Sequence, residues 1–417
     1  MTMAWGLRAF DNGHWRESFM TQVVRAVKPA LLLGVLVISG CSAPSSTPVH
    51  APPASIKPMT GATLDPARWT GVAWQPASPT PLPSAVDFAT IVWRGGIVVA
   101  GATMSGKAGA WASTDAVNWS KLADDTFGPT IDITNFAQTA HGLVAFGVDY
   151  MRNPPCTGSN PCAAPALLAW TSTDGTHWQR QPDPPFANQR LATVYGDQRM
   201  AIVATFDGTQ IHIWASSDGV NWQAGSISAV EMGGLAKVGS EYVATGYVRN
   251  TALSSQRPEF ILTSTKASEA VAAWSSTDGL AWTPVAGYAG PDEIVAGRSG
   301  YWGVTSSGFN PDEGAWWHSA DGTTWNRLPD HGPYGSVNGD GGTWNAIPYI
   351  GGDGNSIVAW GIAADGAFAI WASSGDASWS RLSMTGASPQ RARSVVVVPG
   401  GVLAVTDAGV LFGKANE

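Results

Sequence analysis

The sequence predicts an all-β fold in which short strands recur in repeated units, and three observations support this. A nine-residue pattern, Trp-x-Ser-x-Asp-Gly-x-x-Trp, occurs six times with small variations. The composition combines 21 Trp and 49 Gly with only 13% charged residues, which suits short strands joined by tight turns better than helices. The copies follow one another at intervals of 43 to 60 residues, as expected for repeated structural units.

Each copy of the pattern predicts a strand, a turn and a second strand. Ser and Asp side chains can accept hydrogen bonds from nearby backbone N–H groups, and Gly permits the positive φ that a tight turn often needs. The first copy has Ala116 in place of Gly, and the sixth reverses the order to Gly375-Asp376. The turn residues of the six copies are Ser113 and Asp115, Ser172 and Asp174, Ser216 and Asp218, Ser276 and Asp278, Ser319 and Asp321, and Ser373 and Asp376.

These copies resemble the Asp box, or BNR repeat, of sialidases and their relatives. In that family the box is the hairpin between the third and fourth strands of a β-propeller blade, and it lies at the blade periphery, away from the active centre. The resemblance covers residues 69–417 in architecture, but only roughly ten residues per blade in motif. It therefore implies a structural role for these Ser, Asp and Trp residues, and it carries no catalytic residue across.

The number of blades follows from the segments that remain at the two ends. After the last box come three predicted strands, "SVVVV" (394–398), "GVLAVT" (401–406) and "GVLFG" (409–413), with no fourth. Before the first blade, residues 69–79 predict a fourth strand that lacks the other three. We therefore predict a seven-bladed β-propeller whose N-terminal strand closes the last blade, because a closed ring removes open sheet edges. Six blades with loose ends is the alternative.

The N-terminus predicts a targeting segment followed by a tether. The apolar run at 29–40 has the length of a signal-peptide core, and "ISGC" resembles the lipobox of bacterial lipoproteins, in which Cys41 would be lipidated. The Pro-, Ser- and Ala-rich stretch at 41–66 would be an extended tether reaching roughly 75 Å. The predicted domains are thus a signal peptide at 1–40, a tether at 41–66 and a propeller at 67–417. A plain secretory signal cleaved near Ala43 is the alternative, and translation starts at Met1 or Met20.

We expect no cofactor and no metal site. Cys156 and Cys162 are separated by five residues, and in an exported protein they suit a local disulfide. Zinc would need two more soft ligands nearby, and none is within sequence reach. The segment "GATMSGKA" (101–108) is close to a phosphate-binding loop, but Ala108 replaces the Ser or Thr and no helix is predicted to follow.

Charge and loop length indicate where a partner would bind. Residues 1–40 hold four basic and two acidic residues, which leaves 19 basic and 29 acidic residues, a net charge of −10, in the rest of the chain. No basic stripe is present, so nucleic acid is not an expected partner.

The long loops should lie on the face opposite the boxes. Their acidic, aromatic and amide side chains suit the binding of a sugar or a peptide, and the alternative for any single residue is a solvated loop tip. The candidate binding residues are Tyr150, Arg152, Arg249, Asp312, Glu313, Asp330, His331, Tyr334, Asp340 and Trp344.

The sequence favours a non-enzymatic lipoprotein at the extracytoplasmic face of a membrane, acting as a binding or assembly scaffold for a protein or neutral glycan partner. Non-enzymatic propellers with similar repeats, including photosystem assembly factors, make this plausible by analogy. A sialidase-like glycoside hydrolase is the main alternative. In that family three arginines hold the substrate carboxylate, whereas the long loops here offer only Arg152, Arg249 and Arg257 and no recognisable triad. A purely structural component of the envelope is a third possibility.

Overall fold

The computed structural model of the protein describes a large part of residues 69–416, all in strands, turns and irregular connections. This described part contains no helix, and hence none long and apolar enough to cross a membrane. The described ranges are 69–78, 85–93, 96–103, 108–128, 130–149, 167–249, 269–297, 300–305, 315–328, 349–352, 357–363, 367–373, 379–386, 389, 392, 394–398, 400–406 and 409–416.

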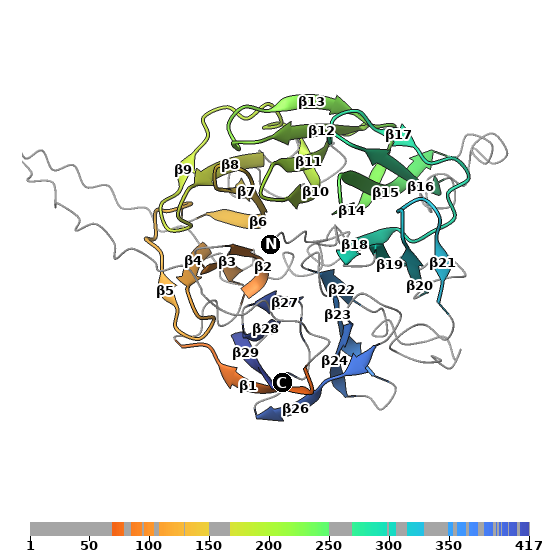
Figure 1. Cartoon of the computed structure of the whole chain (residues 1–417). Helices are drawn as coiled ribbons and strands as arrows, with labels where there is room; N and C mark the ends of the chain where they lie inside the picture. Colours follow the sequence, from red (N-terminus) through yellow and green to blue (C-terminus); the bar gives the residue numbers. More distant parts are fainter. Residues whose placement is uncertain are drawn as a thin grey trace, which may run out of the picture. The chain divides into compact units, whose positions relative to one another are not determined.

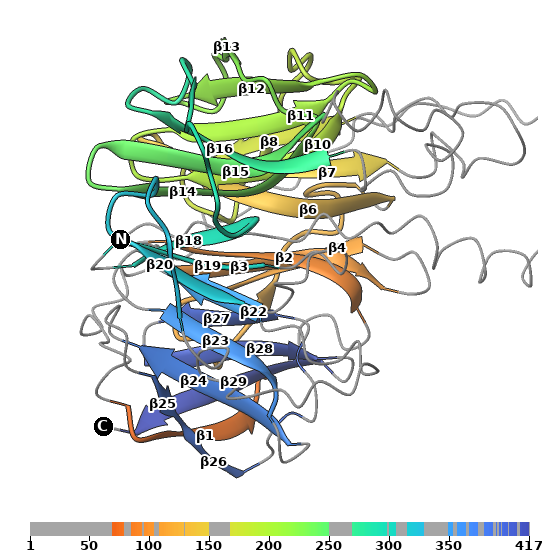
Figure 2. The ribbon, with the colours of Figure 1, turned by 90° about the vertical axis from the view of Figure 1, so that its right-hand side faces the viewer.

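The strands form seven small sheets arranged in a ring, as Figures 1 and 2 show. Six of the sheets contain four consecutive antiparallel strands, and we name them blades 1 to 6 in chain order. Blade 1 contains β2 (Ala85–Trp93), β3 (Gly96–Thr103), β4 (Ala108–Ser113) and β5 (Ser120–Lys121). Blade 2 contains β6 (Ile131–Gln138), β7 (Leu143–Asp149), β8 (Leu167–Ser172) and β9 (Gln179–Arg180). Blade 3 contains β10 (Arg190–Gly196), β11 (Ala201–Phe206), β12 (Ile211–Ser216) and β13 (Gln223–Ser226).

The remaining three of these blades follow the same plan. Blade 4 contains β14 (Glu231–Val238), β15 (Glu241–Arg249), β16 (Glu269–Ser276) and β17 (Thr283–Pro284). Blade 5 contains β18 (Glu293–Gly297), β19 (Gly300–Val304), β20 (Trp316–Ser319) and β21 (Asn326–Arg327). Blade 6 contains β22 (Tyr349–Gly352), β23 (Ile357–Ile362), β24 (Phe368–Ser373) and β25 (Ser380–Arg381). In every blade the first strand is innermost and the fourth lies at the periphery (Figure 1).

Blade 7 joins the two ends of the propeller, as the sequence predicts. Its first three strands are β27 (Ser394–Val398), β28 (Gly401–Thr406) and β29 (Gly409–Asn416), and its fourth is the N-terminal β1 (Gly71–Pro76). The antiparallel pairing of β1 with β29 runs from Gly71 opposite Asn416 to Pro76 opposite Leu411. The seven-bladed prediction is confirmed, and the six-bladed alternative is wrong because β1 completes the last sheet.

Blade 7 also contains a fifth strand that the sequence analysis did not predict. β26 (Ser383–Gly386) pairs in parallel with the outer edge of β1. It follows β25 almost directly, so the outer strand of blade 6 continues onto blade 7. No turn signal separates β25 from β26, which explains why the strand cannot be recognised from local sequence.

Seven hydrophobic clusters fill the spaces between neighbouring blades. The cluster between blades 7 and 1, for example, contains Ile97 and Val99 together with Leu403 and Phe412. The second strands are buried on both faces, and therefore they are apolar at successive positions instead of alternating. The core is thus a ring of inter-blade contacts, which holds the strands of neighbouring blades together.

Candidate functional site

Most of the residues that the sequence proposes for a binding face lie outside the described part of the chain. Arg249 is the exception: it is the last residue of β15, and its backbone lies opposite Glu269 of β16. Cys41, the cysteines 156 and 162, and Asp376 are also outside the described ranges. The nine binding-face candidates not described are Tyr150, Arg152, Asp312, Glu313, Asp330, His331, Tyr334, Asp340 and Trp344.

The box turns have a shared hydrogen-bond pattern, which blade 2 illustrates. Ser172 Oγ donates to Asp174 Oδ1 at 3.2 Å and accepts the N–H of Gly175 at 2.8 Å. Asp174 Oδ1 also accepts the N–H groups of Thr176 and His177, both at 2.8 Å. The same bonds recur in the turns that start at Ser113, Ser216, Ser276 and Ser319.

These hydrogen bonds also lower the pKa of the box carboxyl groups. The N–H groups of Ala281 and Leu280 lower the pKa of Asp278, because they stabilise its ionised form. The N–H of Thr324 is the main cause that lowers the pKa of Asp321 to about 2. A carboxylate that is ionised at neutral pH has no proton to give to a leaving group, so these two turns do not offer a general acid.

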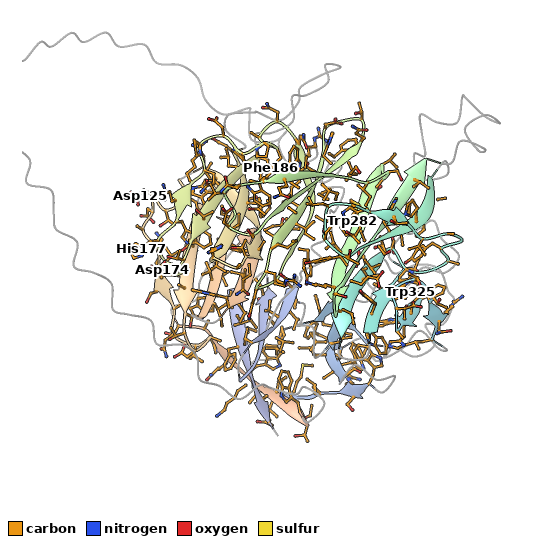
Figure 3. The ribbon with its side chains drawn as sticks, turned by 45° about the horizontal axis from the view of Figure 1, so that its top comes forward. Asp125, Asp174, His177, Phe186, Trp282 and Trp325 are labelled. Atoms are coloured by element: carbon orange, nitrogen blue, oxygen red, sulfur yellow. The ribbon has the colours of Figure 1, made fainter. Side chains whose placement is uncertain are left out.

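The second Trp of the box covers the turn and closes it. In four of the boxes its Nε1 donates to the carbonyl oxygen at the glycine position of the same turn, at 3.0 to 3.1 Å, whereas the buried Nε1 atoms of Trp222 and Trp379 make no such bond. Figure 3 labels two of these rings, Trp282 and Trp325. The donors are Trp119, Trp178, Trp282 and Trp325, and the acceptors are the carbonyl oxygens of Ala116, Gly175, Gly279 and Gly322.

The box turns also contact the preceding blade. Gly219 has a φ of 77°, and a Cβ at this position would lie under 3.0 Å from Val144 of blade 2. On the perimeter, the N–H of Ser226 in blade 3 donates to the carbonyl oxygen of Leu280 in the box turn of blade 4 at 3.1 Å. Both contacts link one blade to the next, so the box residues are engaged in the framework of the ring.

Two Asp–His pairs lie at opposite ends of the blades, one at a box turn and one at a connection between a second and a third strand. His177 Nδ1 is 2.6 Å from Asp174 Oδ2 at the box turn of blade 2, where the two side chains are 64% and 45% exposed (Figure 3). His212 Nε2 is 2.7 Å from Asp207 Oδ2 in the connection between β11 and β12. The hydroxyl of Thr209 is the first of several groups that lower the pKa of Asp207. The second pair lies on the loop face, which we define as the end of the ring formed by the second-to-third-strand and blade-to-blade connections.

The innermost strands of blades 1 to 4 contain β-bulges near the loop face, whereas the described residues of β18, β22 and β27 in blades 5 to 7 pair without a register shift. In blade 4 the bulge includes Gly233 and Gly234, and the N–H of Gly234 donates to Thr245 Oγ1 at 3.0 Å. Thr245 Oγ1 donates to the carbonyl oxygen of Asp292 at 2.6 Å, and Tyr247 OH donates to Asp292 Oδ2 at 2.6 Å. This buried network fixes the start of blade 5 against blade 4.

A buried ion pair joins blades 3 and 4 at the opposite end of their strands. Lys237 Nζ is 2.8 Å from Asp197 Oδ2 and 2.9 Å from Tyr242 OH, and both charged side chains are only 7% exposed. Asp197 Oδ1 accepts the N–H groups of Arg199 and Met200. Burial opposes the charge of Lys237, but the bonds to Asp197 and Tyr242 raise its pKa overall. The ammonium group therefore stays protonated at neutral pH and is not a nucleophile.

The sequence analysis did not identify this ion pair or the Thr245–Asp292 network. Each joins residues from two blades, and neither has a fixed spacing in the sequence. Among the described residues, no group of His, Cys, Asp and Glu is placed to hold a metal ion.

Comparison with known proteins supports the architecture. No family model matches the sequence, and no curated protein matches it. A solved structure described as "YCF48 bound to D1 peptide" is similar, with a TM-score of 0.50 and 15% identity over 82% of this chain and 97% of the other. Virginiamycin B lyase from Staphylococcus aureus is similar with a TM-score of 0.50 and 10% identity, over 83% of this chain and 99% of the lyase. At these identities the similarity concerns the fold alone, and the chain is a seven-bladed β-propeller.

Proposed function

We propose that this protein is a membrane-tethered binding scaffold that holds a protein or neutral glycan partner on its loop face and catalyses no reaction. The observation that carries the proposal is that the acidic side chains named below are already bonded to other groups of the protein. The described box carboxylates accept backbone N–H groups, Asp197 is paired with Lys237, and Asp292 is held by Tyr247. Retaining or inverting glycosidases need two carboxyl groups that face the substrate, whereas these groups are hydrogen-bonded within the box turns or buried between blades.

The net charge supports a particular class of partner. With a net charge of −10 after residue 40, the chain repels an anionic substrate and favours a protein with a basic patch or an uncharged glycan. The similar structure described as YCF48 carries a bound peptide, whereas the other similar propeller is named as a lyase. The fold is therefore compatible with binding and with catalysis, and only the chemistry of the side chains at the site distinguishes the two.

The proposed location follows from the N-terminal segment. Lipidation of Cys41 would attach the protein to the extracytoplasmic face of the membrane, and residues 41–66 would form the tether. A tether of this composition gives the propeller reach without adding a folded element.

A pair of photo-crosslinking positions in blade 3 tests the proposal. Thr209 lies in the connection between β11 and β12 on the loop face, and Val220, which is 51% exposed, lies in the box turn between β12 and β13 at the opposite end. A photo-reactive amino acid is placed at each position in turn in the full-length protein, expressed in its own host. We expect a discrete adduct with a protein or glycan from position 209 and none from position 220.

The same experiment can contradict the proposal. Equal adduct patterns from positions 209 and 220 would show that the loop face is not the binding surface. The absence of adducts together with turnover of a glycoside by the same preparation would favour the hydrolase.

A further inference from the structure

We propose that Gln189, His212 and Trp214 of blade 3 form a subsite for a neutral sugar ring. The subsite lies at the loop-face end of β11 and β12, on the side of blade 3 that packs against blade 2. It rests on the proposed function, and it narrows the partner on the loop face from a protein or a glycan to a glycan.

The alternation of side chains along the two strands places the polar groups of the subsite on one face. Thr205 of β11 and His212 of β12 lie directly opposite each other in the antiparallel pair, so their side chains share a face of the sheet. Asp207 and Trp214, each two residues further along the chain, share the same face. The contacts agree with this placement, because Trp214 Nε1 donates to Thr205 Oγ1 at 3.0 Å. His212 Nε2 likewise lies 2.7 Å from Asp207 Oδ2.

Blade 3 differs from the other blades at the position of His212. This position lies two residues before the first Trp of the box, and packing between blades does not require a polar ring there. The other Asp–His pair, which contains His177, lies at the opposite end of its blade, so the two pairs do not belong to one repeated pattern. In the other five boxes the position of His212 is small or apolar, and the residues are Gly109, Leu168, Ala272, Ala315 and Ala369.

The carboxylate of Asp207 orients His212 and leaves one ring nitrogen for a ligand. Asp207 Oδ1 accepts the hydroxyl and the N–H of Thr209 and the N–H of Gln210. The Thr209 hydroxyl is the largest of the causes that lower the pKa of Asp207, so this carboxyl group is ionised and can only accept hydrogen bonds. Nε2 of His212 therefore carries the proton of their bond. In the neutral ring Nδ1 is an acceptor, and it bonds to no other residue that the structure describes.

Gln189 supplies the complementary donor. Its Oε1 accepts the hydroxyl of Thr205, and the same hydroxyl accepts the N–H of Trp214. Since Oε1 is engaged in this bond, the two N–H groups on Nε2 remain, and they bond to no other group among the described residues. An acceptor on His212 and a donor on Gln189 match the hydroxyl groups of a sugar, because each hydroxyl both donates and accepts.

Trp214 supplies the apolar surface of the subsite. Its ring is half-buried, and its centroid lies 6.5 Å from that of the His212 ring, with 31° between the two planes. On its buried side it meets the ring of Phe186 edge-on, with the centroids 6.2 Å apart (Figure 3 labels Phe186). A fixed aromatic ring beside a few placed polar groups is the usual composition of a small-ligand site.

The surroundings favour a neutral glycan over a protein or an anion. Among the residues that the structure describes, Val220 is the only exposed large hydrophobic side chain, and it lies in the box turn at the opposite end of blade 3. The described part of this face therefore lacks the exposed apolar anchor on which most protein interfaces depend. An anion would be repelled by the carboxylates of Asp207 and of the exposed Asp183, and Arg190, which lies opposite Phe206, has its side chain on the other face of the sheet.

Binding of the full-length protein to an array of saccharides tests the subsite. The probes are neutral mono- and oligosaccharides, together with the same saccharides carrying sialic acid or sulfate. We expect binding to at least one neutral saccharide and weaker binding to its charged form. Titration calorimetry with that neutral saccharide then gives the affinity of the wild type and of each variant.

Three variants connect the binding to the named side chains. His212→Ala removes the acceptor, and Gln189→Glu keeps the oxygen that bonds to Thr205 but removes the amide donor, so each should weaken the affinity about tenfold or more. His177→Ala is the matched control, because it removes an Asp-bonded imidazole at the box turn of blade 2, and it should leave the affinity unchanged. Exposed Asp–His pairs contribute little to stability, so the melting temperatures of the two His variants should stay close to that of the wild type.

The subsite and the proposed function can fail separately. A wild-type protein that binds no neutral saccharide, or a folded His212→Ala protein with the wild-type affinity, would overturn the subsite. Photo-adducts from position 209 that contain only a protein would support the scaffold and overturn the glycan subsite. A neutral saccharide that binds through His212 and is then hydrolysed would support the subsite and overturn the non-enzymatic scaffold.

Discussion

The hydroxyl of Thr245 in blade 4 donates a hydrogen bond to the carbonyl oxygen of Asp292, at the entry to blade 5, over 2.6 Å. The same hydroxyl accepts the N–H of Gly234 in the β-bulge of the innermost strand. Thr245 is fully buried, so water cannot replace either bond. One side chain thus satisfies a backbone donor in one blade and a backbone acceptor in the next.

Replacing this hydroxyl should destabilise the ring. Thr245→Val keeps the shape but leaves a buried N–H and a buried carbonyl oxygen without partners, and we expect a loss of about 2 to 3 kcal/mol in the free energy of unfolding. Thr283→Val, at an exposed position of the outer strand β17, is the control and should cost less than about 0.5 kcal/mol. Denaturant unfolding of the two variants measures the difference, and equal stabilities would mean that the network does not join the blades.

The buried ion pair predicts a strong coupling between blades 3 and 4. Lys237→Met should cost about 3 to 5 kcal/mol, because it leaves the buried carboxylate of Asp197 without its counter-charge. Adding Asp197→Asn to Lys237→Met should recover part of that loss, since the amide oxygen can still accept from Arg199 and Met200. A double-mutant cycle measures the coupling, and additive effects of the two substitutions would contradict a direct pair.

The box carboxylates predict loss of stability in acid. The folded protein lowers the pKa of Asp321 from its ordinary 3.8 to about 2, so its contribution is present above pH 4 and is lost as the pH falls toward 2. Asp321→Asn should therefore weaken the pH dependence of the melting temperature in this range.

Asp174→Ala should cost about 1 to 3 kcal/mol in the free energy of unfolding because turn N–H groups lose their acceptor, but it should leave partner binding intact. Loss of binding by a stable Asp174→Ala protein would show that the box is a functional site.

The closing strand predicts different outcomes for two deletions. Deletion of residues 69–79 removes β1, exposes an edge of β29 and uncovers the Val-rich strands of blade 7, so cooperative melting should be lost or aggregation should follow. Deletion of residues 42–60 in the tether should leave the melting temperature unchanged. Equal tolerance of the two deletions would mean that the ring closes by another route.

The fold was largely predictable because its signals are local and repeated. The spacing of the six boxes gives the blades, and the three strands after Trp379 require the strand at Trp74 to complete a seventh sheet. β26 was missed because its pairing with β1 joins residues more than 300 positions apart in the sequence. The strand has only four residues, Ser-Met-Thr-Gly, and they are mostly exposed, so no alternation of apolar and polar residues indicates a strand.

The candidate site was less predictable because its contacts cross from one blade to another. Lys237 lies in the innermost strand of blade 4 and Asp197 directly follows the innermost strand of blade 3, and nothing in either segment indicates that the two charges meet. Thr245 and Asp292 are brought together by a two-glycine bulge, which the sequence suggests only weakly. The loop-face candidates other than Arg249 fall outside the described residues, so their assignment to binding stays a prediction.

The central claim, that the propeller binds a partner and does not hydrolyse a glycan, is tested most directly by turnover of a fluorogenic sialoside. A carboxylate-bearing sugar needs a cluster of arginines, and the long loops offer only Arg152, Arg249 and Arg257 among several acids. The purified full-length protein should give no turnover between pH 4 and pH 8. Turnover above background that disappears when one of these three arginines is replaced would contradict the scaffold and establish the hydrolase.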